Sequence, residues 1–344
     1  MTRIDNRKGL KLEKEESIMT SKVVSEKSNS LMIRIVNGVV DIGGRFSKGV
    51  VSVVDWLVCM PFILFLLVGL VVAMFGDYKD AKAEEQYSQG MRYYDGDGVA
   101  LDRIAAVRLF REAAEVGHVK AQCRLGKCYF DGDGVAKDRD QAMRWYHKAA
   151  DQGDSEAQFN LAFCCADDED KSEMVKWIRK SAEQGYAEAQ CALGHLYANG
   201  VGLARDKVEA VKWIRKAAAQ NHRLALCNLA NCHVAGDGVS QDIGEAVRLY
   251  RKSAELGLPE AQFQLGVSYA NGLGVAQDWR EAARWYRKAA EQGHAKAQLA
   301  LGLCYQTGLG VDQDVYEASR WISEAKKDAQ LQRELQGAVK MLSR

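Results

Sequence analysis

A repeat of 36 residues fills most of this chain and constrains its fold more than any other feature. Six alanines open successive copies at intervals of 36, 32, 36, 36 and 36 residues: Ala121, Ala157, Ala189, Ala225, Ala261 and Ala297. A divergent copy opens at Glu85, which makes seven: 85–120, 121–156, 157–188, 189–224, 225–260, 261–296 and 297–332. A unit this short cannot bury an apolar face alone, so the copies must stack.

The pattern within each copy predicts two helices joined by a glycine turn. Counted from the opening residue, large or small apolar residues recur at positions 1, 5 and 9, which is one helical face. Position 6 is Gly or Ala, which lets a second helix approach closely. A Gly-x-Gly turn follows in every copy but the third, and an aspartate at position 18 can cap the second helix: Asp102, Asp138, Asp206, Asp242, Asp278 and Asp314.

Position 25 of each copy holds a large residue, most often tryptophan, on the second helix. We expect this position to lie in the core. If so, Trp213→Ala should lower the free energy of unfolding by about 3–5 kcal/mol, as for other buried aromatics.

The string AQFQLGVSYANGLGVAQDWREAARWYRKAAEQGH from Ala261 resembles the Sel-one-like repeat (SLR), a relative of the tetratricopeptide repeat. The resemblance extends over 85–332. It implies an all-α fold, a right-handed α/α superhelical solenoid of seven hairpins that acts as an adaptor in protein complexes.

Two copies depart from the pattern. The third lacks the Gly-x-Gly turn and is four residues short, so we expect the superhelix to change pitch there. In the last copy Lys326 replaces the second alanine of the usual pair. We therefore expect its second helix to run on toward Arg344, with 333–344 as a polar helical cap.

An uncharged stretch of twenty residues, 56–75, precedes the repeats. A helix of this length crosses about 30 Å of hydrocarbon, so we predict one transmembrane helix. A cleaved signal peptide is the alternative, because Ala81-Lys82-Ala83 resembles a cleavage site. Residues 1–30 are predicted to be a disordered polar tail, and 31–55 a juxtamembrane segment. Only Gly76 to Lys79 separate the membrane helix from the first repeat helix, so the repeats should start almost at the membrane.

The orientation of the chain in the membrane depends on opposing arguments. Arg45 and Lys48 lie before the apolar stretch, and Lys79, Lys82 and Arg92 after it, so the positive-inside rule does not decide. The short charged tail favours a cytoplasmic N-terminus with the repeats outside. Free thiols in the repeats would favour a reducing compartment for them.

The nine cysteines carry no metal or redox motif, because no CxxC pair occurs. Eight lie in the repeats, all on first helices. Some cysteine-rich members of the SLR family have been called β-lactamases and staple each repeat with a disulfide between its two helices. That pattern is not present here, so we expect free thiols, and the β-lactamase label does not carry over.

Other site chemistries are weak or missing. A formal net charge of +1 argues against nucleic-acid binding. The Asp-Gly-Asp-Gly strings at 95–98 and 131–134 lack the glutamate of a calcium loop, since Ala106 and Ala142 stand at the twelfth position. The six histidines do not cluster. We therefore expect no catalytic residue, metal or cofactor, and a scaffold that binds a partner protein or peptide. The alternatives are a hydrolase or cell-wall-active enzyme, and a self-associating structural protein.

The candidate partner groove lies on the first helices, at positions 3 and 7, opposite the leucine at position 5. Related tetratricopeptide repeats line their concave surface with equivalent positions. Contact with the adjacent repeat is the alternative role for these residues. The candidate residues are Tyr87, Met91, Phe159, Phe163, His195, Asn231, Phe263, Val267, Leu299 and Leu303.

Overall fold

The computed structural model describes residues 53–165 and 171–328. Within them the chain forms fourteen α-helices and no strand, two helices for each of seven repeats, so the predicted all-α solenoid is confirmed. The handedness of the superhelix stays a prediction. The chain divides into two compact units, Met1–Ala142 and Met143–Arg344, and each is described by itself.

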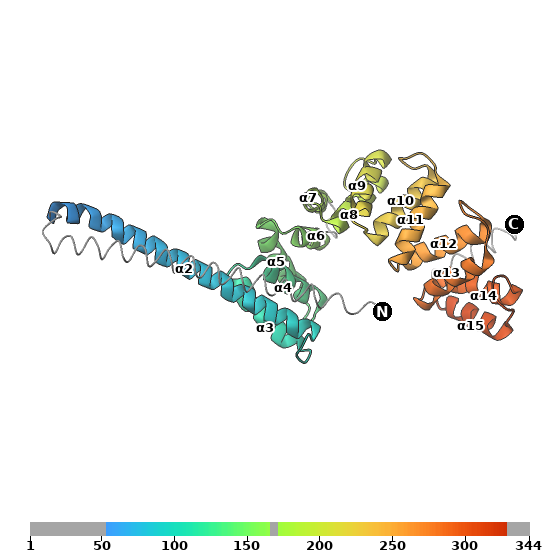
Figure 1. The fold of residues 1–344 in the computed structure, drawn as a ribbon, viewed down its shortest axis with the longest axis horizontal. Coiled ribbons are helices and arrows are strands. Elements are labelled where there is room, and N and C mark those ends of the chain that lie inside the picture. The colour runs from blue at the N-terminus through green and yellow to red at the C-terminus, as the bar shows by residue number, and fades with distance from the viewer. Residues whose placement is uncertain (1–52, 166–170, 329–344) are drawn as a thin grey trace. The chain divides into compact units, whose positions relative to one another are not determined.

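The first unit holds α2 (Val53–Asp95), α3 (Arg103–Glu115) and α4 (Val119–Asp131), and α5 (Arg139–Asp151) leads into the second. The helices of the second unit alternate as first and second helices of successive repeats (Figure 1). They are α6 (Ser155–Cys164), α7 (Ser172–Glu183), α8 (Ala187–Asn199), α9 (Lys207–Ala219), α10 (Arg223–Ala235), α11 (Ile243–Glu255), α12 (Pro259–Asn271), α13 (Trp279–Glu291), α14 (Ala295–Thr307) and α15 (Val315–Ala325).

Helix α2 is continuous over 43 residues, so no linker separates its N-terminal half from the first repeat. In the part of the chain that the structure describes, no helix combines the length and the apolar character needed to cross a membrane. Most side chains of 56–75, the predicted transmembrane helix, are outside the described structure. Residues 1–30 and 31–52 are outside it entirely. The membrane helix therefore stays a prediction.

The cores of the hairpins contain the position-5 leucine of the first helix in repeats 2 to 7, together with position 26 of the second helix. Leu125, Leu161 and Leu193, at position 5, are fully buried. Position 6 glycine lets position 26 approach: a Cβ added at Gly266 would lie 2.6 Å from the ring of Tyr286. Residues at position 26 are buried in six repeats: Phe110, Tyr146, Ile178, Ile214, Tyr250 and Tyr286.

The expectation that position 25 is the core position is wrong for most repeats. Trp213 is only half-buried, whereas the next residue, Ile214, is 3% exposed. Since neighbouring residues on a helix differ by about 100°, position 26 faces the first helix and position 25 lies at its flank. Trp177, 4% exposed, and Leu249, also 4% exposed, are the buried exceptions.

The glycine turns have the predicted chemistry. The first glycine of the pair ends the first helix in the left-handed region, as at Gly272 with φ 66°. Asp278 then caps α13 by accepting from the backbone N–H groups of Arg280 and Glu281. Its own N–H donates to the carbonyl oxygen of Tyr269, 2.9 Å away, which closes the turn.

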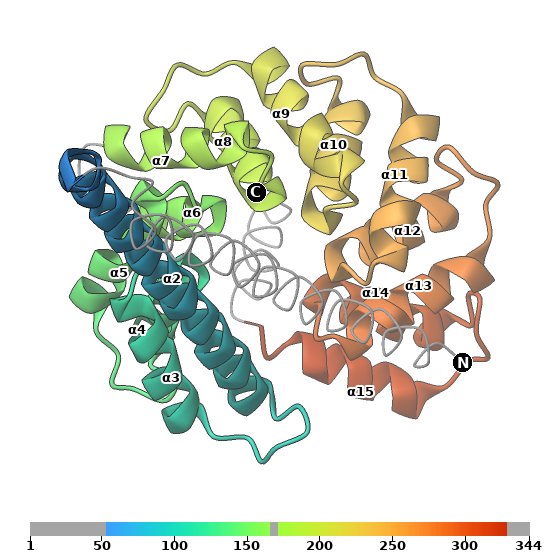
Figure 2. The same cartoon turned by 60° about the vertical axis from the view of Figure 1, so that its left-hand side comes forward.

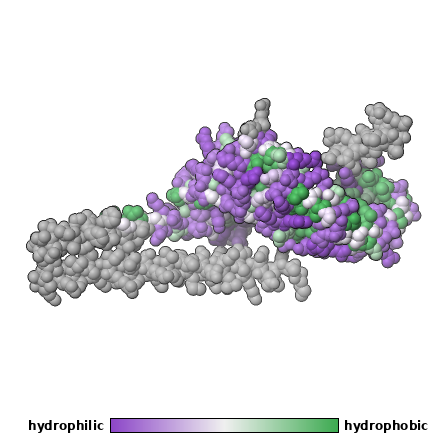
Figure 3. All heavy atoms as spheres, turned by 90° about the horizontal axis from the view of Figure 1, so that it is seen from above, coloured by the Kyte–Doolittle hydropathy of each residue, from purple (hydrophilic) through white to green (hydrophobic). Residues whose placement is uncertain are grey.

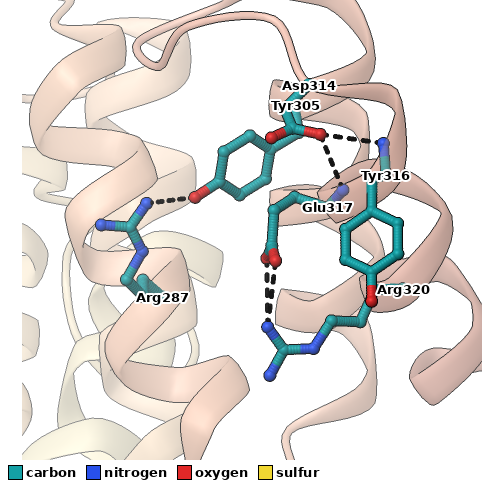
Figure 4. A network of polar contacts seen from close by, with 6 residues as sticks. All are labelled: Arg287, Tyr305, Asp314, Tyr316, Glu317 and Arg320. Carbon is teal, nitrogen blue, oxygen red and sulfur yellow. Dashed lines mark hydrogen bonds and ion pairs between the residues drawn. The ribbon is translucent and has the colours of Figure 1, made fainter.

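Adjacent repeats are joined by bonds between a second helix and the next first helix. Arg287 donates to the hydroxyl of Tyr305 at 2.6 Å, and Arg251 makes the same bond to Tyr269 at 2.9 Å. Figure 4 shows the Arg287 bond beside the cap of α15, where Asp314 accepts from the N–H groups of Tyr316 and Glu317.

The final helix is shorter than expected. Helix α15 ends at Ala325, and beyond Lys326 the N–H groups of Lys327 and Asp328 donate to carbonyl oxygens only three residues earlier, those of Glu324 and Ala325. The expected run of this helix toward Arg344 is thus wrong, because turn bonds replace the four-residue helical bonds at Lys327 and Asp328. The predicted cap, 333–344, lies outside the described residues. So does 166–170, and the expected change of pitch in the third repeat stays a prediction.

Candidate binding face

Residues at position 7 of the first helices form a strip on the second unit, here called the position-7 strip: Phe163, His195, Asn231, Val267 and Leu303. Each lies about 200° around its helix from the buried leucine and about 100° from position 6, which meets the second helix. In Figure 2, α8, α10 and α12 follow the inner side of the curve described by this unit, with α9 and α11 outside. The first helices that carry the strip therefore lie on the inner side of this curve.

The exposure of the strip varies along it. Phe163 is 50% exposed and Leu303 47%, and His195 is also exposed. Asn231 is exposed but accepts a hydrogen bond from the hydroxyl of Tyr250. Val267 is half-buried, because it packs against the core cluster that contains Leu301. In the first unit, Met91 at the same position is half-buried.

Position 3 is more enclosed than position 7. The ring of Phe263 lies 5.8 Å from that of Tyr286 and 5.1 Å from that of His294. In the first unit, Tyr87 lies 5.9 Å from Phe110 in the same way. Position 3 sits about 60° from the glycine that contacts the second helix, which explains these contacts. These contacts join the two helices of one repeat and the turn that follows, so they differ from the contact with the adjacent repeat that was the alternative role for this position.

Phe159 lies at position 3 and also contacts the position-7 strip. Its ring meets the exposed ring of Phe163 edge to face at 4.9 Å, and Tyr186, in the turn after α7, at 5.5 Å. Leu299 is half-buried. The structure thus brings Phe159 and Phe163 together, and it leaves position 7 as the more accessible part of the candidate groove.

Apolar surface also gathers near the C-terminal end of the repeats. Figure 3 shows hydrophobic patches over the C-terminal repeats among largely hydrophilic surface. In the last two repeats, the exposed apolar residues on first helices and turns are Leu273 at 49%, Leu303 at 47% and Leu309 at 41%.

Charged side chains are concentrated on the second helices. Position 24 is Lys or Arg in every repeat, and in repeats 3 to 7 it pairs with a glutamate one turn earlier, as in Lys212–Glu209 at 2.8 Å. Lysines also cover the half-buried tryptophans: the Nζ of Lys216 lies 3.7 Å from the ring centroid of Trp213. These exposed pairs contribute little to stability individually.

The thiols and phenols of the repeats are structural. The eight cysteines of the repeats form no disulfide, as expected. Burial raises the pKa of the Cys191 thiol to about 11 and that of Cys227 to about 12. Such thiols are protonated at neutral pH and are poor nucleophiles. Burial likewise raises the pKa of Tyr286 to about 12.

Two features of the first helices were missed in the sequence. A buried glutamine at position 2 donates to a carbonyl oxygen at the end of the preceding repeat, as Gln262 does to Ala254 at 3.1 Å. The recurring Ala-Gln pair in the sequence was the signal that could have predicted this bond.

The histidines between repeats are also N-caps: Nδ1 of His222 accepts from the N–H of Ala225 at 3.2 Å. Their shared position was visible, but not their role.

The model of the Sel1 repeat family matches seven consecutive segments, 81–118, 119–154, 155–186, 187–222, 223–258, 259–294 and 295–327. The chain belongs to the Sel1 repeat family. In the Sel1 register the second to seventh repeats begin at the N-termini of their first helices, two residues before the alanines used above as starting points, and the first begins within α2.

Two solved Sel1-type structures resemble this chain closely. One is a protective antigen of uropathogenic Escherichia coli with an SLR fold, 33% identical, with a TM-score of 0.60. The similarity covers 77% of this chain and 58% of that one, so this chain spans little more than half the length of the antigen. The other is a Sel1 repeat protein of Oxalobacter formigenes, 31% identical, with a TM-score of 0.61, covering 74% and 76%. A search of curated proteins finds no match.

Proposed function

We propose that this Sel1 protein is a membrane-tethered scaffold that holds a partner protein or peptide against the position-7 strip. The exposure of large apolar side chains there carries the proposal. Phe163 and Leu303 are 50% and 47% exposed on helices whose opposite faces are packed in the core. The two residues lie in the third and seventh repeats, one at each end of the strip, and large apolar side chains exposed on a face favour a role in protein binding.

The tether is the stretch 56–75. Twenty uncharged residues span about 30 Å as a helix, the thickness of the hydrocarbon layer. The backbone of α2 continues from this stretch into the first repeat, which would hold the repeats close to the membrane surface. Deleting 56–75 should move the protein from the membrane pellet to the supernatant after fractionation. Retention of the deletion variant in the pellet would contradict the tether.

The proposal places the N-terminus in the cytoplasm and the repeats on the other side. The short charged tail favours this orientation, and the eight repeat cysteines, which form no disulfide, favour the reverse. Protease treatment of intact and permeabilised cells decides between them. Cleavage of the repeats in intact cells supports the proposed orientation, and cleavage only after permeabilisation reverses it.

A binding role is also favoured over hydrolysis. A catalytic site needs titratable groups that converge at one place. Among the described residues, no group of three or more His, Cys, Asp or Glu side chains could hold a metal ion. The cysteines with raised pKa values are spread over four repeats. Turnover of a β-lactam or cell-wall substrate by the purified protein would overturn this reading.

The scaffold is tested by removing the exposed side chains of the strip. Phe163→Ala with Leu303→Ala should abolish recovery of a stoichiometric partner from detergent extracts and leave the melting temperature nearly unchanged. A matched control is Leu224→Ala with Leu256→Ala, two residues 47% and 45% exposed but outside the strip. Loss of the partner in the control alone would place the binding face elsewhere. Sedimentation of the purified chain distinguishes the self-associating alternative.

A further inference from the structure

The last repeat has an outer end that the described residues leave uncovered. In the fifth repeat, Tyr250 at position 26 belongs to one core cluster with Ala261 and Leu265, at positions 1 and 5 of the next first helix. The counterpart of Tyr250 in the last repeat, Ile322, is only half-buried, whereas position 26 is buried in the other six repeats. Val315, at position 19 of the last repeat, is 72% exposed. An apolar end of this kind is where an array needs a cover.

The turn after α15 begins like a turn that leads into an earlier first helix. The N–H groups of Lys326 and Lys327 donate to carbonyl oxygens four and three residues earlier, and those of Leu256 and Gly257 do the same after α11. The third bond differs, because the N–H of Asp328 donates three residues back and its counterpart five. In this register Asp328 stands where the N-cap residue of the next first helix stands after α11. Aspartate is one of the best N-cap residues.

Residues 329–344 carry the sequence pattern of a first helix in the same register. Leu331 falls at position 1, Leu335 at position 5 and Val339 at position 9, which share one helical face. Gln332 falls at position 2, the place of the glutamine that joins a first helix to the preceding repeat. The segment has sixteen residues and α14 has 13, so its length suffices for a first helix.

The polar bond between repeats is replaced on both sides at this junction. In the fifth and sixth repeats, an arginine at position 27 donates to the tyrosine at position 9 of the next repeat, as Arg287 does to Tyr305. Position 27 of the last repeat is Ser323, and the position 9 that follows is Val339. A helix at 329–344 therefore buries neither an arginine nor a tyrosine hydroxyl without its partner.

Position 6 indicates a first helix without a second helix beside it. The seven repeats have Gly or Ala at this position, and a Cβ at Gly266 would already lie 2.6 Å from the ring of Tyr286 on the second helix. The segment has Gln336 there. A side chain of this size fits only where that face is open to solvent, and a polar outer face is what the terminal unit of a repeat array requires.

We propose that 329–344 covers the outer end of the last repeat as an additional first helix, with Leu331 and Leu335 against Ile322. A second copy of the chain is a poorer cover. Its first repeat has Glu85 and Gln89 at positions 1 and 5, and a carboxylate against Ile322 would lose its hydration without a counter-charge. The inference concerns the end of the array and does not depend on the partner proposed for the position-7 strip.

The test compares hydrogen–deuterium exchange of the full-length protein in detergent with that of matched variants. Leu335→Glu places a charge at position 5, on the packed face, and Gln336→Glu places the same charge at position 6, on the open face. Exchange in α15 should quicken at least about tenfold in Leu335→Glu and change less than about twofold in Gln336→Glu. Deletion of 329–344 should quicken it as much as Leu335→Glu does. Exchange in α9 and α11 should stay unchanged and serves as the internal reference.

Three outcomes would overturn the proposal. Equal exchange of α15 in the full-length protein and the deletion variant would show that 329–344 does not cover the end. Quickened exchange in Leu335→Glu and Gln336→Glu alike would show that the helix does not pack in the proposed register. Protection of α15 that survives the deletion and rises with protein concentration, with a dimer in sedimentation, would assign the end to a second copy. If Leu335→Glu also quickens exchange in α9, the deletion variant decides alone.

Discussion

The carbonyl oxygen of Ile243 occupies the space that a side chain on Gly274 would need. A Cβ added to Gly274 would lie 2.8 Å from that oxygen, which belongs to the first turn of α11 in the preceding repeat. The second glycine of the Gly-x-Gly turn is therefore a contact between repeats as well as a turn residue. Its backbone also lies in the left-handed region, with φ 69°.

Gly274→Ala should destabilise the protein more than the substitution of a glycine whose only cost is backbone strain at positive φ. A left-handed alanine costs about 1–2 kcal/mol, and forcing the repeats apart adds about 1–3 kcal/mol. Gly293→Ala is the matched control, because Gly293 has φ 85° and open space at its Cβ. Denaturant titration of both variants measures the difference. Equal losses would mean that the contact with Ile243 is not needed for stacking.

Position 26, not position 25, should dominate the stability of the hairpins. Ile214→Ala should lower the free energy of unfolding by about 2–5 kcal/mol, as for a fully buried residue. Trp213→Ala should cost less, because Trp213 is half-buried and its Lys216 contact contributes only about 0.5–1 kcal/mol. Thermal unfolding of the two variants compares them. A larger loss for Trp213→Ala would restore the expectation drawn from the sequence.

Two glycine-to-alanine substitutions in neighbouring helices should act in opposite directions. Gly266→Ala removes a helix-breaking glycine, a gain of about 1 kcal/mol, but its Cβ would lie 2.6 Å from the buried ring of Tyr286. The clash costs about 1–3 kcal/mol, so the net effect should be destabilising. Gly244→Ala, on the exposed start of α11, has no such contact and should stabilise by up to about 1 kcal/mol. If both variants are more stable than the unchanged protein, the ring of Tyr286 can move aside at little energetic cost.

The histidine cap of α10 should make stability depend on pH. Burial lowers the pKa of His222 below its ordinary value of 6.5, so the folded state favours the neutral ring whose Nδ1 accepts from Ala225. A lowered folded-state pKa means that this contribution is complete above the unfolded pKa, near 6.5, and is lost as the pH falls through the folded value.

Replacing His222 with asparagine should remove that dependence. Asparagine caps a helix without titrating, and a cap contributes about 1 kcal/mol. Chemical denaturation across the acidic range should therefore show a shallower loss of stability for His222→Asn than for the unchanged protein. Parallel curves for the two proteins would exclude His222 as the source of the effect.

The spacing of residues was sufficient to derive the repeat architecture. The position-5 leucines, the Gly-x-Gly pairs and the capping aspartates are local signals. Helix periodicity, positive φ and N-cap bonds each involve residues close in sequence. The structure confirms each of them, in the buried Leu193, the left-handed Gly272 and the Asp278 cap.

The tertiary structure decided which of several adjacent positions meet across the core and which remain accessible. Position 25 or 26 could each face the first helix, and the sequence alone favoured the larger tryptophan. Packing instead placed Ile214 against Gly194, because the close approach of the two helices leaves room for only one of the two side chains there. In the same way, the enclosure of Phe263 and the exposure of Leu303 depend on neighbours about twenty or more residues away. Local periodicity determines a helical face, whereas contacts between helices determine how much of that face is left to bind a partner.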